Sequence, residues 1–298
     1  MTGRPPNRLF CFGIGFSAQA LIRRLDRHAW AIAGTVTSDA AAFELRRHHA
    51  IEAFVFDGSR PVAGLRDTLA DATHLLVSVP PGAAGDPVLI HHAADIAAAA
   101  HLGWIGYLST IGVYGDRDGE WIDESVEPQP TSDRSRHRRD AEIAWQQLAA
   151  DSGKRCLLFR LAGIYGPGRS AIDTVRSGRA KRIIKPGQKF NRIHVDDIAR
   201  VLEASMGGKG TRNVYNLADD EPSPPQDVIA YAATLLGLPM PPAVPFDDPS
   251  LGAMTRSFFG ESKLVRNDLV KADLDIQLAY PTYRDGLAAI ASEAANHR

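Results

Sequence analysis

The chain has 298 residues, of which 44% are hydrophobic and 23% charged, and its formal net charge at pH 7 is −1. This composition is that of a globular protein with one large domain or two unequal ones. The near-neutral charge excludes a strong field that would recruit nucleic acid or an anionic membrane. The longest apolar stretch, residues 93–105, contains Asp95 and His101 and is too short to span a bilayer.

The two cysteines and the N-terminus favour a cytoplasmic protein. Cys11 and Cys156 both lie in apolar, strand-like runs, which predicts small buried thiols in a reducing compartment. The first residues, Met1 to Pro6, lack the apolar core of a signal peptide.

The first half of the chain alternates between strand-like and helix-like patterns. Residues 9–12 form an apolar run that ends at Gly13, and apolar residues at spacings of three and four follow it. Strands and helices then alternate over residues 31–36, 39–48, 51–56, 74–79, 86–101 and 104–109. This alternation predicts right-handed crossovers and a parallel sheet buried on both faces, the doubly wound α/β Rossmann fold.

The second half begins regularly and then breaks up. A helix is predicted over residues 132–150, with Ser132 as its N-cap, and a sixth strand over residues 154–161. Residues 222–249 hold eight of the nineteen prolines, and a last helix covers residues 283–296. We therefore expect a Rossmann domain of residues 1–168 and 191–221, with a smaller cap or substrate domain of residues 169–190 and 222–298.

A glycine-rich turn follows the first strand and opens the first helix. Its residues are Gly13, Ile14, Gly15, Phe16, Ser17 and Ala18. Gly13 permits the tight turn, and Gly15 lets the backbone approach a pyrophosphate at the helix N-terminus. Ala18 is small enough for close packing of helix on strand. The pattern predicts a dinucleotide site that includes Phe16 and Ser17, and the alternative is a tight turn that binds nothing.

The residues after the second strand leave the choice between NAD and NADP open. Asp39 lies 21 residues after Ala18 and could accept a hydrogen bond from a ribose 2′-hydroxyl, as in NAD-binding proteins. It could equally be a helix cap. Thr37 and Ser38 could hydrogen-bond the 2′-phosphate of NADP.

Five later segments resemble motifs of the extended short-chain dehydrogenase/reductase family, which includes sugar-nucleotide epimerases and dehydratases. They are residues 56–58, 108–115, 160–168, 191–199 and 215–218. The resemblance implies that Asp57 contacts the adenine amine, that Thr110 holds the catalytic Ser/Thr position, and that Pro167 lies in the loop beside the nicotinamide. Pro80, after the fourth strand, would border the cofactor groove.

The chain departs from that family where the chemistry is done. The family's catalytic helix carries Pro, Tyr, Lys and Glu at successive intervals of four, and here Pro130, Arg134, Arg138 and Glu142 keep that spacing. None of the seven tyrosines has a lysine four residues later. The chain thus resembles atypical members that keep the cofactor fold and lose the Tyr–Lys pair.

An arginine cannot replace the catalytic tyrosine, because its pKa lies above about 12 and it gives up no proton near pH 7. Arg134 and Arg138 lie one helical turn apart and would share a face, as a doubly positive donor pair for a carboxylate or phosphate. We predict that they face the pocket with Thr110 and bind an anion or a carboxylate of the cap. The alternative is a solvated basic face, because residues 134–139 form a charge run.

Other candidates have plainer interpretations. Tyr114 is usually structural in its motif, and His194 is expected to pack near the hinge. Asp196 and Asp197 are expected to cap the following helix. Arg169 either contacts a substrate phosphate or is solvated. The cysteines and the adjacent histidine pairs lack the spacing of metal ligands, so no metal is expected.

Two classes of function follow. The first is a reductase or epimerase for a small, anionic substrate, using Thr110 and an acid not yet identified. The second is a dinucleotide-binding sensor or scaffold without turnover. Neither class implies a nucleic-acid or membrane partner, and the substrate and oligomeric state stay open.

Overall fold

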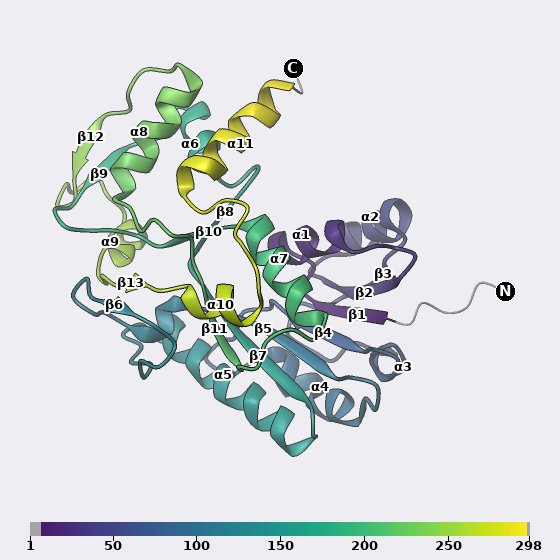
Figure 1. Cartoon of the computed structure of the whole chain (residues 1–298). Coiled ribbons are helices and arrows are strands. Elements are labelled where there is room, and N and C mark those ends of the chain that lie inside the picture. The colour runs from purple at the N-terminus through teal and green to yellow at the C-terminus, as the bar shows by residue number, and fades with distance from the viewer. Residues whose placement is uncertain (1–6, 297–298) are drawn as a thin grey trace.

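The computed structural model describes residues 7–296. Within them lies a seven-stranded parallel sheet of order β11-β7-β5-β4-β1-β2-β3 (Figure 1). Its strands are β1 (Asn7–Phe12), β2 (Trp30–Val36), β3 (Glu52–Val55), β4 (His74–Val77), β5 (Trp104–Thr110), β7 (Arg155–Leu161) and β11 (Val214–Leu217). The predicted doubly wound α/β fold is therefore confirmed. The strand order reverses between β1 and β4, which is where such sheets bind ligands.

Helices cover both faces of the sheet (Figure 1). One face carries α1 (Phe16–Arg24), α2 (Asp39–His49) and α7 (Val195–Met206), and the other carries α3 (Leu65–Ala70), α4 (Pro87–Ala98) and α5 (Asp133–Asp151). Each face has its own apolar core, with Leu21 and Leu202 in the first and Leu69 and Trp145 in the second. No helix among the described residues is long and apolar enough to cross a membrane.

Of the two helix caps predicted from the sequence, one is confirmed and one is wrong. Ser132 caps α5 as predicted, and its Oγ accepts from the N–H of Ser135 at 3.2 Å. The expectation that Asp196 and Asp197 cap α7 is wrong, because His194 is the N-cap and its Nδ1 accepts from the N–H of Asp196 at 3.2 Å. Asp197 is buried and accepts instead from the backbone N–H groups of residues 279 and 280, at 2.7 and 3.0 Å.

A smaller helical layer lies beyond the carboxyl edge of the sheet (Figure 1). It contains α6 (Ala171–Arg176), β9 (Arg182–Ile184), α8 (Pro225–Leu236), β12 (Ala243–Pro245), α9 (Ala253–Phe258) and α11 (Tyr283–Asn296). Strands β9 and β12 pair in parallel. Val228, Ala232, Tyr283 and Leu287 belong to an apolar cluster separate from the two cores of the sheet.

Short elements join this layer to the sheet. Strands β8 (Gly163–Tyr165) and β10 (Arg192–His194) pair in parallel, and the 3-10 helix η1 (Ile111–Tyr114) follows β5. Strand β13 (Leu264–Val265) pairs with β6 (Trp121–Ile122), and α10 (Asp268–Asp273) places Val270 in the core beneath α7. Residues 264–274 thus pack on the Rossmann part, and the exact division into two domains stays a prediction.

Candidate functional site

A cavity of about 1520 Å³ lies between the carboxyl edge of the sheet and the smaller layer. It is larger than the roughly 300–1,000 Å³ of a pocket for one small ligand, so it has room for a dinucleotide and a second molecule. A smaller cavity of about 460 Å³ lies at the opposite end of β1 and β2, away from the glycine turn. The larger cavity is therefore the candidate site.

Six of the predicted site residues line this cavity and five do not. Those that line it are Gly15, Phe16, Ser17, Thr110, Arg134 and Arg138. Those outside its lining are Gly13, Asp39, Asp57, Pro80 and Pro167, although Ser78 and Gly168, close to the last two, are part of it. The three predicted catalytic positions and three of the eight predicted cofactor positions thus share one cavity, and their roles stay predictions.

The glycine turn is held by contacts at the point where the strand order reverses. The N–H of Gly13 donates to Thr35 Oγ1 at 2.9 Å, and Ser78 Oγ donates to the Gly13 carbonyl at 2.6 Å. Gly13 has φ of 87°, and a Cβ there would lie 2.6 Å from Ser78 Oγ. Only glycine fits this position without strain.

The N-terminus of α1 opens into the cavity without a side-chain cap. Gly15 is the N-cap, it forms no side-chain cap hydrogen bond, and the first turn has no acidic residue. A Cβ added to Gly15 would meet nothing within 4 Å. Free N–H groups and the partial positive charge of the helix are what a pyrophosphate requires. The residues present therefore fit a dinucleotide.

The segment after β2 presents an acceptor, and Arg46 of the following helix is bonded elsewhere. Asp39 is exposed and is the first residue of α2, while Ser38 is the N-cap and accepts from the N–H of Ala41. Arg46, on the same helix, donates to the Ala53 carbonyl at 3.0 and 2.6 Å, which ties it to β3.

Asp57, after β3, is partly engaged by its own loop. Its Oδ1 accepts from the N–H of Ser59 at 2.9 Å and from Ser59 Oγ at 2.6 Å. These hydrogen bonds hold the pKa of Asp57 below its ordinary value. Its second carboxylate oxygen accepts no hydrogen bond from another described residue, and the expected contact with an adenine amine stays a prediction.

Thr110 closes the end of β5 at the cavity. Its Oγ1 accepts from the N–H of Gly112 at 3.1 Å and so caps η1. A Cβ on Gly112 would lie 2.9 Å from Ser135 Oγ and 3.4 Å from Thr110 Oγ1, so both hydroxyls flank this glycine. The arrangement places small hydroxyl groups beside the start of α5.

Arg134 and Arg138 both line the cavity, but they are not equivalent. Arg138 Nη1 donates to the Leu108 carbonyl at 2.9 Å and to Tyr107 Oη at 3.1 Å, which holds its guanidinium against β5. Arg134 is exposed and makes no hydrogen bond or ion pair with any residue the structure describes. Thus neither arginine contacts a cap carboxylate, and the predicted fork of two free guanidiniums is reduced to one.

Most of the remaining charge run is paired. Arg136 bonds Asp133 at 2.5 Å, and Arg139 bonds both Glu127 at 3.3 Å and Glu142 at 3.2 Å. Arg136 and Arg139 are thus paired, whereas Arg134 is exposed and also lines the cavity, so the choice between an anion-binding and a solvated Arg134 stays a prediction.

Glu142, the position that the family motif retains, anchors α5 to the sheet. It is fully buried, accepts from Arg160 Nε at 3.0 Å and Nη2 at 2.8 Å, and accepts from Ser109 Oγ at 2.5 Å. This fixes the helix that carries Arg134 against β5 and β7.

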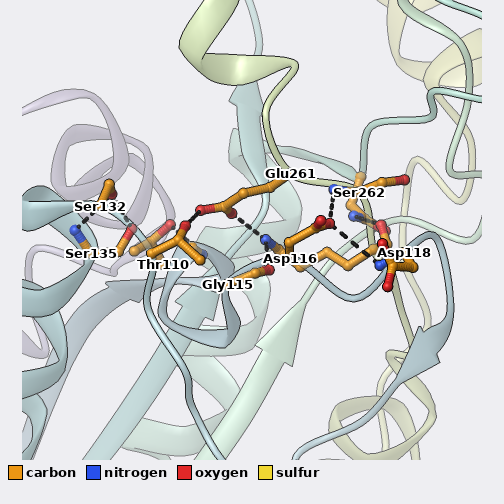
Figure 2. A network of polar contacts seen from close by, with 12 residues as sticks. Thr110, Gly115, Asp116, Asp118, Ser132, Ser135, Glu261 and Ser262 are labelled. Carbon is orange, nitrogen blue, oxygen red and sulfur yellow. Dashed lines mark hydrogen bonds and ion pairs between the residues drawn. The ribbon is translucent and has the colours of Figure 1, made fainter.

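The segment after α9 brings two charged groups that the sequence reasoning missed. Glu261 accepts from Thr131 Oγ1 and from Lys263 Nζ, both at 2.5 Å, and Lys263 also donates to the Gly115 carbonyl (Figure 2). Glu261 and Lys263 line the cavity. Besides bonding each other, Glu261 and Lys263 bond residues that lie more than 120 positions away in the sequence. No local spacing could therefore have revealed them.

Tyr114 and His194, the other titratable candidates, are both buried, and burial sets their protonation states. Tyr114 Oη donates to Asn216 Oδ1 at 2.8 Å, and burial raises the pKa of Tyr114. His194 packs between two tyrosine rings, and burial lowers its pKa to about 4. Tyr114 lies outside the cavity lining, so its expected structural role stays a prediction, and the lowered pKa of His194 keeps its ring neutral at pH 7.

Neither cysteine is a nucleophile in this fold. Both are buried and unpaired, and burial raises the pKa of each thiol to about 12. No group of three or more His, Cys, Asp or Glu side chains within residues 7–296 is arranged to hold a metal ion.

The cavity lining is strongly basic although the chain is nearly neutral. Its basic residues are Arg134, Arg138, Arg169, Arg179, Lys181, Lys189, Arg192 and Lys263, and its acidic residues are Asp173 and Glu261. Asp173 is occupied by the capping box of α6, and Arg169 lies over the ring of Phe16 with its guanidinium carbon 5.7 Å from the ring centroid. The field in the cavity favours anions.

Comparisons with known proteins agree with this geometry. No family model matches the chain. A conserved protein of unknown function from Silicibacter pomeroyi is 48% identical, with 96% of this chain and 99% of that chain covered and a TM-score of 0.88. The UDP-glucuronic acid 4-epimerase of Bacillus cereus, solved with NAD, is 16% identical, with 96% of each chain covered and a TM-score of 0.73.

A curated relative comes from a Streptomyces species and is named 3-diazoavenalumate denitrifying reductase. It is 27% identical over 150 residues, which are 48% of this chain and 49% of the relative. The match therefore spans about half the length of that protein.

The fold is that of the NAD-dependent epimerases and dehydratases, the extended short-chain dehydrogenase/reductases. Within that class, the chain belongs to the same family as the Silicibacter pomeroyi protein of unknown function.

Proposed function

We propose that the chain is an NAD(P)-binding oxidoreductase or epimerase-like protein for a small anionic molecule, working without a Tyr–Lys pair. The observation that carries this proposal is the uncapped N-terminus of α1, which opens at Gly15 into a basic cavity with room for two ligands. The NAD-bound neighbour and the reductase relative support the cofactor and the class of reaction.

Within the proposal, NAD is favoured over NADP. Asp39 is exposed at the start of α2, three residues after β2, and a carboxylate in this region accepts from a ribose 2′-hydroxyl and repels a 2′-phosphate. The nearest helix arginine, Arg46, is held on the Ala53 carbonyl. Replacing Asp39 by Asn should reduce the preference for NADH over NADPH in paired titrations, and an unchanged ratio would argue against this role.

The bound nicotinamide would supply or accept the hydride, and the side chains would position the second ligand. Thr110 presents a hydroxyl at the cavity wall. Arg134, in the first turn of α5, presents an unpaired guanidinium at the same cavity. Both stabilise negative charge on a ligand, and neither is an effective proton donor near pH 7.

Calorimetric titration of the purified protein with NAD⁺, NADH, NADP⁺ and NADPH tests the cofactor half of the proposal. Micromolar binding of one oxidised and reduced pair is the expected result. If none of the four binds, the glycine turn is only structural and the oxidoreductase function is excluded.

A non-catalytic dinucleotide sensor is the alternative, and the replacement of both chemical residues by Arg134 and Arg138 favours it. A bound cofactor that changes redox state when metabolite mixtures are added supports the enzyme. Binding of both redox forms with no turnover, together with a protein partner recovered in pulldowns, supports the sensor.

A further inference from the structure

Arg134 differs from the other arginines of the cavity lining in having no side-chain partner among the described residues. Arg138 is bonded to the Leu108 carbonyl and Tyr107, and Lys263 is bonded to Glu261 and the Gly115 carbonyl. Arg134 lines the same cavity and has no such partner among the described residues. An unpaired guanidinium at a cavity wall is available to a ligand.

The start of α5 reinforces that charge. Arg134 is the second residue of a 19-residue helix, so it lies in the first turn, where the backbone N–H groups give a partial positive charge. Asp133, the one acidic residue of that turn, is already paired with Arg136 at 2.5 Å. The field from the helix and the guanidinium of Arg134 therefore act in the same direction.

The planar shape of the guanidinium indicates the ligand group. Arg138 is held against β5 and Arg169 lies over the ring of Phe16, whereas Arg134 has neither kind of contact. A guanidinium pairs two parallel N–H groups with the two oxygens of a planar carboxylate. The wall of the same cavity is also apolar in part, with Ile183, Phe258 and Phe259 in its lining. These features fit one carboxylate on an apolar organic body.

We propose that Arg134 is a substrate-recognition residue that binds the carboxylate of an organic acid, in the position where related enzymes place their catalytic tyrosine. The inference rests on the proposed function, because it assumes a dinucleotide in the adjoining part of the cavity. It goes beyond that function by naming the substrate class: a monocarboxylate whose acid group lies beside the reacting atom. A residue that serves as the acid in relatives becomes a specificity residue here.

A matched pair of probes tests this inference. The protein is saturated with NADH and titrated with cinnamate and with cinnamamide, which share an apolar body and differ in the carboxylate. We expect the wild type to bind cinnamate about tenfold or more tightly than cinnamamide, since a charge-assisted hydrogen bond at one guanidinium is worth about that factor. Arg134→Gln should abolish the difference, and Arg134→Lys should retain part of it.

Arg136→Gln is the matched control, because Arg136 lies on the same helix and pairs with Asp133 outside the cavity lining. It should leave the preference for cinnamate unchanged. Equal affinities for both probes in the wild type, binding of neither probe, or an undiminished preference in Arg134→Gln would each overturn the inference.

The NADH titration separates this result from a failure of the proposed function. If NADH binds normally to wild type and to Arg134→Gln, a lost preference reports on the second ligand alone. If Arg134→Gln instead weakens the binding of NADH, Arg134 contacts the dinucleotide and the inference is wrong. If the wild type binds no dinucleotide, the proposed function itself fails.

Discussion

Glu142 on α5 and Arg160 on β7 form a buried pair, with Glu142 oxygens 3.0 Å from Nε and 2.8 Å from Nη2 of Arg160. Glu142 also accepts from Ser109 on β5, so one carboxylate joins a helix to two strands. The chain keeps this glutamate of the family motif, although it has Arg134 and Arg138 in place of the tyrosine and lysine. The retained residue is the one that holds the helix in place.

We therefore expect Glu142→Gln to destabilise the fold strongly. Removing one partner of a buried ion pair leaves an uncompensated charge, which costs about 3–5 kcal/mol. Urea unfolding should show the loss as a lower midpoint at an unchanged slope. Glu120→Gln, at an exposed glutamate, serves as control and should change stability by less than about 0.5 kcal/mol. A Glu142→Gln variant as stable as this control would contradict the assignment.

Alanine at the two fingerprint glycines should separate folding from binding. Gly13→Ala should cost about 1–3 kcal/mol of stability, because φ is positive and the new Cβ meets Ser78 Oγ. Gly15→Ala should leave stability nearly unchanged, because its Cβ meets nothing. Gly15→Ala should nevertheless weaken the binding of NADH by about tenfold or more, because a methyl group blocks the close approach of the pyrophosphate.

The two effects are measured by urea unfolding and by calorimetric titration of the same preparations. Full NADH affinity in a folded Gly15→Ala protein would show that the dinucleotide does not lie on this turn.

His194 should make stability depend on pH. Its pKa is about 4 in the folded chain and about 6.5 when unfolded, because burial disfavours the imidazolium. The folded state is therefore favoured above the unfolded pKa, and this contribution is lost as the pH falls between those two values. His194→Asn keeps a capping group without a titrating ring. The drop in melting temperature from pH 7 to pH 5 should be smaller in this variant than in wild type.

The comparison with wild type at each pH removes the contributions of other groups, such as His74 and His92, whose pKa values burial also lowers. Parallel pH profiles for the two proteins would show that His194 is not buried as a neutral ring.

Tyr114→Phe should lower the stability of the fold and leave the affinity for the cofactor unchanged. The lost hydroxyl donates to Asn216 Oδ1, and leaving that buried oxygen unpaired costs about 1–3 kcal/mol. NADH affinity should stay within about twofold, because Tyr114 does not line the cavity. A stable Tyr114→Phe protein with impaired turnover would assign a catalytic role to this residue instead.

Hydrophobic pattern predicted six of the seven strands and helices α1, α2, α4 and α5, because buried parallel strands are apolar throughout and their helices have one apolar face, whereas the segment of β11 was matched through the family resemblance. It also predicted the cap at Ser132, since capping depends on residues close in sequence. The short helix α3 was missed, because six residues give little periodicity.

The sequence reasoning failed where distant segments decide. Asp197 was expected to cap a helix, but it accepts from the N–H groups of residues 279 and 280, in the segment between α10 and α11. Arg138 was expected to form a pair of free donors with Arg134, but its Nη1 donates to the Leu108 carbonyl of β5. Glu261 and Lys263 reached the site through contacts with Thr131 and Gly115 that no spacing encodes.

The burial of Cys11 gives the chain an internal reporter. Cys11 lies on β1, two residues before Gly13, and is fully buried with a thiol pKa of about 12. An alkylating reagent can reach that sulfur only when the strand beneath the glycine turn becomes exposed, so the rate of modification measures how often this part of the sheet opens. A dinucleotide on the turn would close the same opening by mass action. Protection of Cys11 relative to Cys156, on β7, would therefore record occupancy of the turn without any substrate and without any change to the chain.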